Sequence, residues 1–128
     1  MAEEGVAVNR RTLSSLPERE RRAIEAFLKR VRRAYPQRVK QMRLFGSKAR
    51  GDSNADSDID ILLVVDEEDW RFRHAISNVA ADVSLAYDVL VEPRVIGQAR
   101  WDEMRRHRFA LYENVQAEGV GLVSAGSA

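Results

Sequence analysis

Residues 44–65 read LFGSKARGDSNADSDIDILLVV, and the rest of the chain is organised around this stretch. An apolar segment leads into Gly46 and Ser47, a polar loop follows, and a long apolar run begins after Asp58. Side chains at positions i and i+2 of a strand share one face, so Asp58 and Asp60 are expected to lie side by side where a strand starts. Two carboxylates placed there repel each other unless a cation lies between them, and Mg²⁺ is a hard cation that prefers such oxygen ligands.

The residues before the loop have the composition of an anion-binding turn. Gly46 lets the backbone approach a ligand closely, and Ser47 supplies a hydroxyl and an N–H group. If residues 47–50 form a short helix, its free N–H groups and dipole attract an anion, and Lys48 and Arg50 add positive charge. Transfer from a nucleoside triphosphate requires a phosphate site followed by such a carboxylate pair. An ordinary polar turn uses the same residue types, but it does not explain two carboxylates on one face above a buried strand.

The spacing of these residues resembles the signature of the nucleotidyltransferase superfamily related to DNA polymerase beta. Gly46-Ser47 is followed by ten intervening residues and then by Asp58-x-Asp60. The local form, GSKARGD with SDIDI, is similar to the minimal nucleotidyltransferases of bacteria and archaea. The resemblance implies that Asp58 and Asp60 hold two Mg²⁺ ions. It also implies a triphosphate-binding set, here Gly46, Ser47, Lys48 and Arg50.

The same resemblance implies a third catalytic and metal-binding carboxylate on the next strand, in an apolar-Asp-apolar setting. Residues 87–92, YDVLVE, fit that setting and predict a strand that is closed by Pro93. Asp88 is therefore the candidate that binds a metal ion and takes the proton from the attacking hydroxyl. An ordinary helix-to-strand turn is the alternative interpretation of Asp88, and Glu92 is the second candidate for the third carboxylate.

Length and composition predict one globular domain over residues 1–128, with flexible ends at 1–13 and 124–128. The chain is 45% hydrophobic and has no cysteine, which excludes disulfides and thiolate zinc sites. It shows neither a signal peptide nor an apolar run of membrane-spanning length, so a cytoplasmic protein is expected. Hydrophobic periodicity predicts helices at 17–35, 67–85 and 97–117, the last broken near His107, and strands at 39–45, 59–65, 87–92 and 120–123. This order predicts an α/β fold, a small mixed β-sheet packed by helices, and the resemblance sharpens it to the nucleotidyltransferase fold.

Charge is distributed unevenly along the chain. Residues 1–50 hold 14 Lys and Arg against 5 Asp and Glu, whereas residues 51–128 hold 7 against 15. A solvated face of an arginine-rich first helix is the favoured interpretation, and an interaction surface for an acidic partner is the alternative. The sequence shows no paired aromatic residues in a basic strand, which argues against nucleic acid as a partner.

These features predict a Mg²⁺-dependent enzyme that moves AMP from ATP to a hydroxyl and releases pyrophosphate. The resemblance implies an antitoxin whose acceptor is a tyrosine of a small helical HEPN-domain toxin encoded nearby. One alternative is a catalytically inactive subunit that binds nucleotide or neutralises a partner by contact. Another is a small-molecule nucleotidyltransferase similar to those that modify aminoglycosides, although 128 residues leave little room for a separate acceptor domain. The sequence leaves the oligomeric state open.

Overall fold

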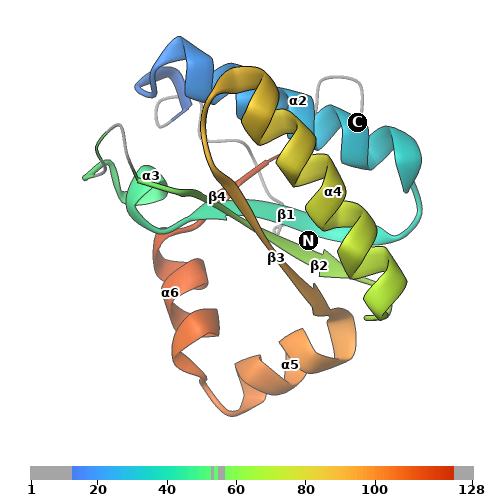
Figure 1. Ribbon diagram of the computed structural model, residues 1–128. Coiled ribbons are helices and arrows are strands. Elements are labelled where there is room, and N and C mark those ends of the chain that lie inside the picture. The colour runs from blue at the N-terminus through green and yellow to red at the C-terminus, as the bar shows by residue number, and fades with distance from the viewer. Residues whose placement is uncertain (1–12, 53, 55–56, 123–128) are drawn as a thin grey trace.

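The computed structural model describes residues 13–52, 54 and 57–122. The ends expected to be flexible therefore lie outside the described residues, apart from Leu13. The elements are α2 (Glu18–Ala34), β1 (Val39–Phe45), α3 (Ser47–Arg50), β2 (Ile59–Val65), α4 (Trp70–Tyr87), β3 (Val91–Gly97), α5 (Gln98–Arg106), α6 (Ala110–Glu118) and β4 (Val120–Gly121). Four strands form one mixed sheet in the order β3-β2-β1-β4, with helices on both of its faces (Figure 1). The predicted α/β class is confirmed.

The strand directions gather three chain segments at one edge of the sheet. β1 pairs antiparallel with β2, and β2 pairs parallel with β3. The end of β1 and the starts of β2 and β3 consequently meet at the same edge. The parallel pair is joined by α4, as a crossover connection requires. The turn after Phe45 therefore lies next to the first residues of β2, and the start of β3 lies on the other side of β2.

β2 is the centre of the fold because it is apolar on both of its faces. Every residue of β2 except Asp60 is buried. One face packs with α2 and α4 in the larger core, to which β2 contributes Ile59, Ile61, Leu63 and Val65. The other face packs with α5 and α6 in a smaller core that contains Leu62, Val64, Trp101, Met104 and Val115. Figure 1 shows these two helix pairs on opposite sides of the sheet. Burial on both faces is what a continuous apolar run predicts for a central strand.

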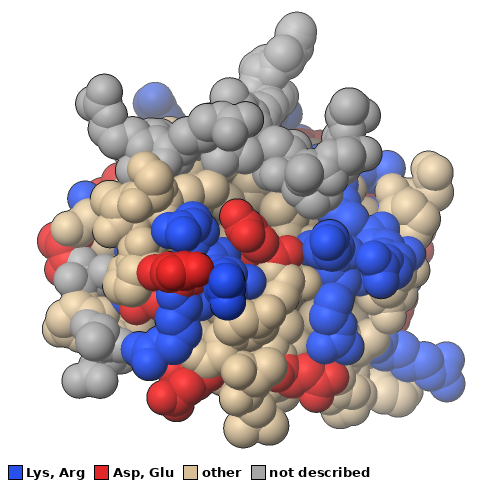
Figure 2. Space-filling model, turned by 90° about the horizontal axis from the view of Figure 1, so that it is seen from above, with Lys and Arg blue, Asp and Glu red and all other residues tan. Residues whose placement is uncertain are grey.

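The arginine-rich helix α2 presents a surface of mixed charge. Lys and Arg side chains are interspersed with Asp and Glu on the face seen in Figure 2. Arg30 pairs with Asp82 of α4 at 3.3 Å, and Arg22 pairs with Glu18 at 3.2 Å. Exposed pairs of this kind are worth little in stability, and their presence agrees with a solvated helix face. Among the described residues, none of the helices has the length and apolar character needed to cross a membrane.

Candidate active site

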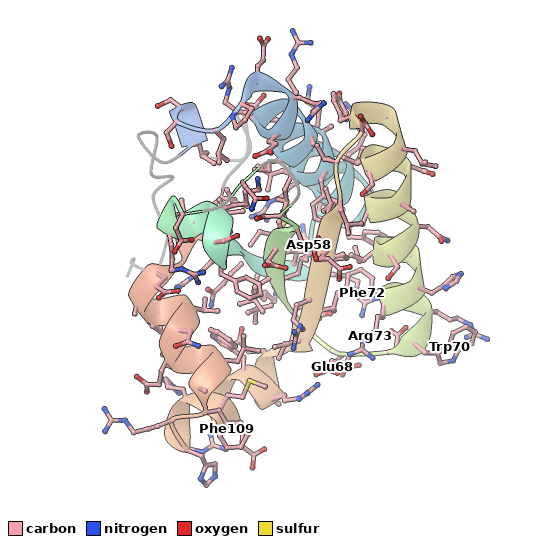
Figure 3. All side chains as sticks on the ribbon, turned by 60° about the vertical axis from the view of Figure 1, so that its left-hand side comes forward. Asp58, Glu68, Trp70, Phe72, Arg73 and Phe109 are labelled. Atoms are coloured by element: carbon pink, nitrogen blue, oxygen red, sulfur yellow. The ribbon has the colours of Figure 1, made fainter. Side chains whose placement is uncertain are left out.

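Asp58 and Asp60 lie where β2 begins, at the edge where three segments meet. Figure 3 places Asp58 at the start of β2, beside β3. The N–H of Ile59 donates to the carbonyl of Leu90 at 2.8 Å, which ties the entrance of β2 to the segment before β3. Ile59 itself is buried in the larger core, so its two acidic neighbours are directed to the opposite face. The structure thus brings this predicted pair together.

Glu92 joins the pair from the neighbouring strand. In the parallel register of β2 and β3, Glu92 lies directly opposite Asp60. Burial raises the pKa of Asp60, and the negative charges of Asp58 and Glu92 raise it further, while Arg94 acts in the opposite direction. A carboxyl group whose ionised form is disfavoured by its own neighbours is the kind of group that gains from a bound cation.

The oxygen donors at this edge fit a hard divalent cation. Asp58, Asp60 and Glu92 offer only carboxylate oxygens, which suit Mg²⁺ better than a softer metal. Across residues 13–52, 54 and 57–122, however, no three Asp, Glu, His or Cys side chains already stand together as a set of metal ligands. The charges of Asp58 and Glu92 act on Asp60, but the three carboxylates do not form a complete set of ligands. A bound cation would have to bring them closer together.

Gly46 forms the turn that packs against Asp60. Its backbone has φ 78° and ψ −158°, a conformation that is essentially restricted to glycine. A Cβ atom on this residue would lie 2.5 Å from Oδ2 of Asp60, so the backbone and the carboxylate touch. Ser47 then begins α3, in which the N–H groups of Ala49 and Arg50 both donate to the carbonyl of Gly46 at 3.1 Å. The turn and the first carboxylates are therefore one packed unit.

Lys48 and Arg50 both pair with acidic side chains. Nζ of Lys48 donates to Glu20 Oε2 at 2.9 Å and to the carbonyl of Asn54 at 2.9 Å, and its side chain is only 2% exposed. Arg50 pairs with Asp52 at 3.1 Å and with Glu118 at 3.4 Å. The two cations expected to bind triphosphate thus each have at least one carboxylate partner in the structure.

Asp88 lies apart from the carboxylates at the start of β2. It is the C-cap of α4, with a left-handed backbone at φ 56° and ψ 51°, and its N–H donates to the carbonyl of Ser84. Its side chain is 95% exposed and approaches Arg19 at 3.8 Å. It also lines a 470 Å³ cleft between α2 and α4, together with Glu18, Arg19, Arg22, Ala86 and Tyr87. This conformation is that of a helix-to-strand turn residue, the alternative interpretation of Asp88 given by the sequence.

The predicted strand at 87–92 is wrong in its start and its end. α4 continues to Tyr87, and β3 runs from Val91 to Gly97 with Pro93 inside it. Pro93 is tolerated because β3 is the outer strand of the sheet, where one side of the backbone needs no ladder partner. Ser84 Oγ accepts from the N–H of Val91 at 2.9 Å, which fixes the helix-to-strand junction.

Arg94 is a residue that the sequence analysis missed. It lies two positions after Glu92 on β3, so it shares the face of Glu92, and its side chain is exposed. Its charge favours the ionised form of Asp60. The signal that could have found it is the two-residue periodicity counted from Glu92, once β3 is known to start at Val91.

Three comparisons with known proteins identify the family and the relatives of this chain. The family model described as a nucleotidyltransferase domain matches residues 24–116. A candidate protein adenylyltransferase of Methanocaldococcus jannaschii, MJ0604, is 33% identical over 100 residues, which cover 78% of this chain and 94% of the relative. A minimal nucleotidyltransferase structure has a TM-score of 0.50 at 26% identity and covers 92% of this chain and 100% of that one. A toxin-antitoxin crystal structure with AMP-PNP has a TM-score of 0.55 at 23% identity, over 80% of this chain and 74% of that one.

Proposed function

Because the chain belongs to the nucleotidyltransferase domain family, we propose that it transfers AMP from ATP to a hydroxyl group of a partner protein. The observation that carries the proposal is the placement of Asp58 and Asp60 at the start of β2, with Glu92 opposite Asp60 in the sheet, at the edge where the Gly46 turn packs against Asp60. The likeness to a candidate protein adenylyltransferase supports a protein as the acceptor. The likeness to a toxin-antitoxin structure that contains AMP-PNP supports ATP as the donor and a toxin as the partner. That this toxin is a HEPN-domain protein modified on a tyrosine is what the family resemblance of the sequence implies.

In the proposed reaction the acceptor hydroxyl oxygen bonds to the α-phosphorus of ATP. The bond between that phosphorus and the bridging oxygen of pyrophosphate breaks, and the hydroxyl proton passes to a carboxylate. Asp58 and Asp60 would hold the Mg²⁺ ions, which would neutralise the triphosphate and offset the charge of the leaving group. The backbone of Gly46 and Ser47 would bind the phosphates next to them.

Glu92 takes the role of the third carboxylate in this proposal, in place of Asp88. Glu92 is opposite Asp60 in the sheet, whereas Asp88 caps a helix and faces solvent beside Arg19. A proton acceptor has to reach the attacking hydroxyl, so position decides between the two. Arg94 replaces Lys48 as the basic side chain nearest to the triphosphate, because Lys48 is buried against Glu20.

The test combines this chain with the product of the adjacent gene, ATP and Mg²⁺. We expect the intact mass of the partner to increase by one AMP group, and we expect the modified peptide to carry it on a tyrosine. Asp60→Asn and Glu92→Gln should abolish the modification, whereas Asp88→Asn is the matched control and should leave it unchanged. Loss of activity in Asp88→Asn with full activity in Glu92→Gln would refute the assignment of the third carboxylate.

A second candidate function is neutralisation of the partner by contact alone. It is favoured by the absence of a preassembled three-carboxylate cluster among the described residues and by the engagement of Lys48 and Arg50 with acidic side chains. In that case the partner would gain no mass from ATP, and Asp60→Asn would still bind and inhibit it. The mass measurement and a binding measurement on the same variant separate the two functions.

A further inference from the structure

The side chain of Lys48 connects three chain segments around the candidate site. Lys48 lies in α3, directly after the Gly46 turn, and its ammonium group donates to Glu20 of α2 at 2.9 Å. The same ammonium group donates to the carbonyl of Asn54 at 2.9 Å. That carbonyl also accepts from the N–H of Ser57, the residue before Asp58, at 3.1 Å. The ammonium group of Lys48 thus links the Gly46 turn, helix α2 and the turn that leads into Asp58.

Stability alone is a poor explanation for this ion pair. Both side chains are 2% exposed, so both charges have lost their hydration. Oε1 of Glu20 is buried and has no hydrogen-bond partner in the part of the chain that the structure describes. Buried ion pairs replaced by well-packed apolar residues often leave stability unchanged or raised, whereas removing one partner leaves an uncompensated charge. Compared with apolar packing, the Glu20–Lys48 pair adds specificity of orientation, because its hydrogen bonds fix which groups face one another.

We propose that Glu20 and Lys48 are positioning residues that hold the Gly46 turn in a fixed relation to Asp58. The proposal rests on the proposed function, because it assumes that a triphosphate binds between these two segments. Neither residue touches the substrate: Lys48 orients the turn on one side and the Asn54 carbonyl on the other, and Glu20 anchors Lys48 to α2. Nucleotide would then bind to a site whose two halves are already aligned.

The test uses the double variant Glu20→Met with Lys48→Met, which removes both charges and keeps similar volume and length. Its free energy of unfolding, measured in urea, should be close to that of the unchanged protein, whereas Lys48→Met alone should be clearly destabilised. AMP transfer by the double variant should fall roughly 10- to 100-fold in kcat/KM, with a raised KM for ATP. The matched control is Glu18→Gln with Arg22→Gln, an exposed ion pair of the same helix, which should leave both constants unchanged.

Amide hydrogen exchange provides a measurement that does not depend on activity. In the double variant, exchange should become about tenfold faster in peptides covering residues 46–52, while peptides from α4 keep their protection. If exchange and kinetics of the stable double variant both match the unchanged protein, the positioning role is overturned. If the unchanged protein transfers no AMP, the proposed function fails, and the exchange measurement alone decides whether the pair positions the turn.

Discussion

Replacement of Gly46 by alanine tests the contact between the turn and the first carboxylates. The backbone conformation of Gly46 lies in a region that costs other residues about 1–3 kcal/mol. In addition, the new Cβ would lie 2.5 Å from Oδ2 of Asp60, where ordinary contact starts at 3.4 Å. The carboxylate or the turn must therefore retreat by roughly 0.9 Å. Misplacement on this scale costs on the order of 10²-fold in rate when the displaced group takes part in the reaction.

Gly51→Ala is the matched control for this variant. Gly51 is the C-cap of α3, with φ 86° and ψ 9°, and a Cβ there meets open space. It should cost about 1–2 kcal/mol of backbone strain, which is comparable to the loss in Gly46→Ala, without moving Asp60. Urea denaturation gives the two stabilities, and AMP transfer gives the two activities. If Gly46→Ala loses no more activity than Gly51→Ala at similar stability, the turn does not position Asp60 for the reaction.

Three further variants test the charges near Asp60 and the packing on the opposite face of the sheet. Since the pKa of Asp60 is raised above its unfolded value of about 3.9, the protein without Mg²⁺ should lose stability as pH rises through the raised pKa. Asp60→Asn should flatten that part of the profile of melting temperature against pH, and an unchanged profile would contradict the charge repulsion at this edge. Arg94→Gln should raise the KM for ATP roughly tenfold through loss of a charge-assisted contact, measured by initial rates, and an unchanged KM would remove Arg94 from the site. Phe72→Ala, which removes a buried ring that packs edge-on against Tyr35 at 4.8 Å, should cost about 3–5 kcal/mol in urea denaturation. Its KM for ATP should not change, because Phe72 lies on the α4 face of the sheet, and a tenfold change would show that the two faces are coupled.

Local patterns were sufficient to predict the central elements. The strands predicted at 39–45 and 59–65 have the same bounds in the structure, and the helix predicted at 17–35 runs from Glu18 to Ala34. The break near His107 is confirmed by the boundary between α5 and α6. The helix follows a hydrophobic period of 3.6 residues and the strand at 59–65 is a continuous apolar run, and both are local signals in the sequence. The side-by-side placement of Asp58 and Asp60 follows from the alternation of side chains along a strand.

A choice between Asp88 and Glu92, the two candidates for the third carboxylate, could not be made in this way, because it depends on pairing between distant segments. YDVLVE is compatible with the end of a helix and with the start of a strand, and only packing against the core extends α4 to Tyr87. Which acid then lies opposite Asp60 is fixed by the register of β3 on β2, a tertiary property.

The burial of Lys48 is hidden for a similar reason. A lysine directly after a Gly-Ser turn has the sequence signature of a phosphate ligand. Its partner, Glu20, is 28 residues earlier in a helix whose sequence is dominated by arginine. The side chain of Lys48 points inward because α3 lies against Glu20 of α2, and a local sequence pattern cannot predict this tertiary contact.

The parallel register between β2 and β3 also limits how this chain can vary. Side chains alternate between the faces of a strand, so sliding β3 by one position would put Val91 or Pro93 where Glu92 now faces Asp60. An insertion or deletion of one residue in the crossover could shift the register of β3 on β2 by one position. An apolar residue would then replace Glu92 opposite Asp60, although no sequence motif had changed. In related chains, the acid that corresponds to Glu92 is better identified by counting from the first residue pair of β2 and β3 than by aligning the local sequence.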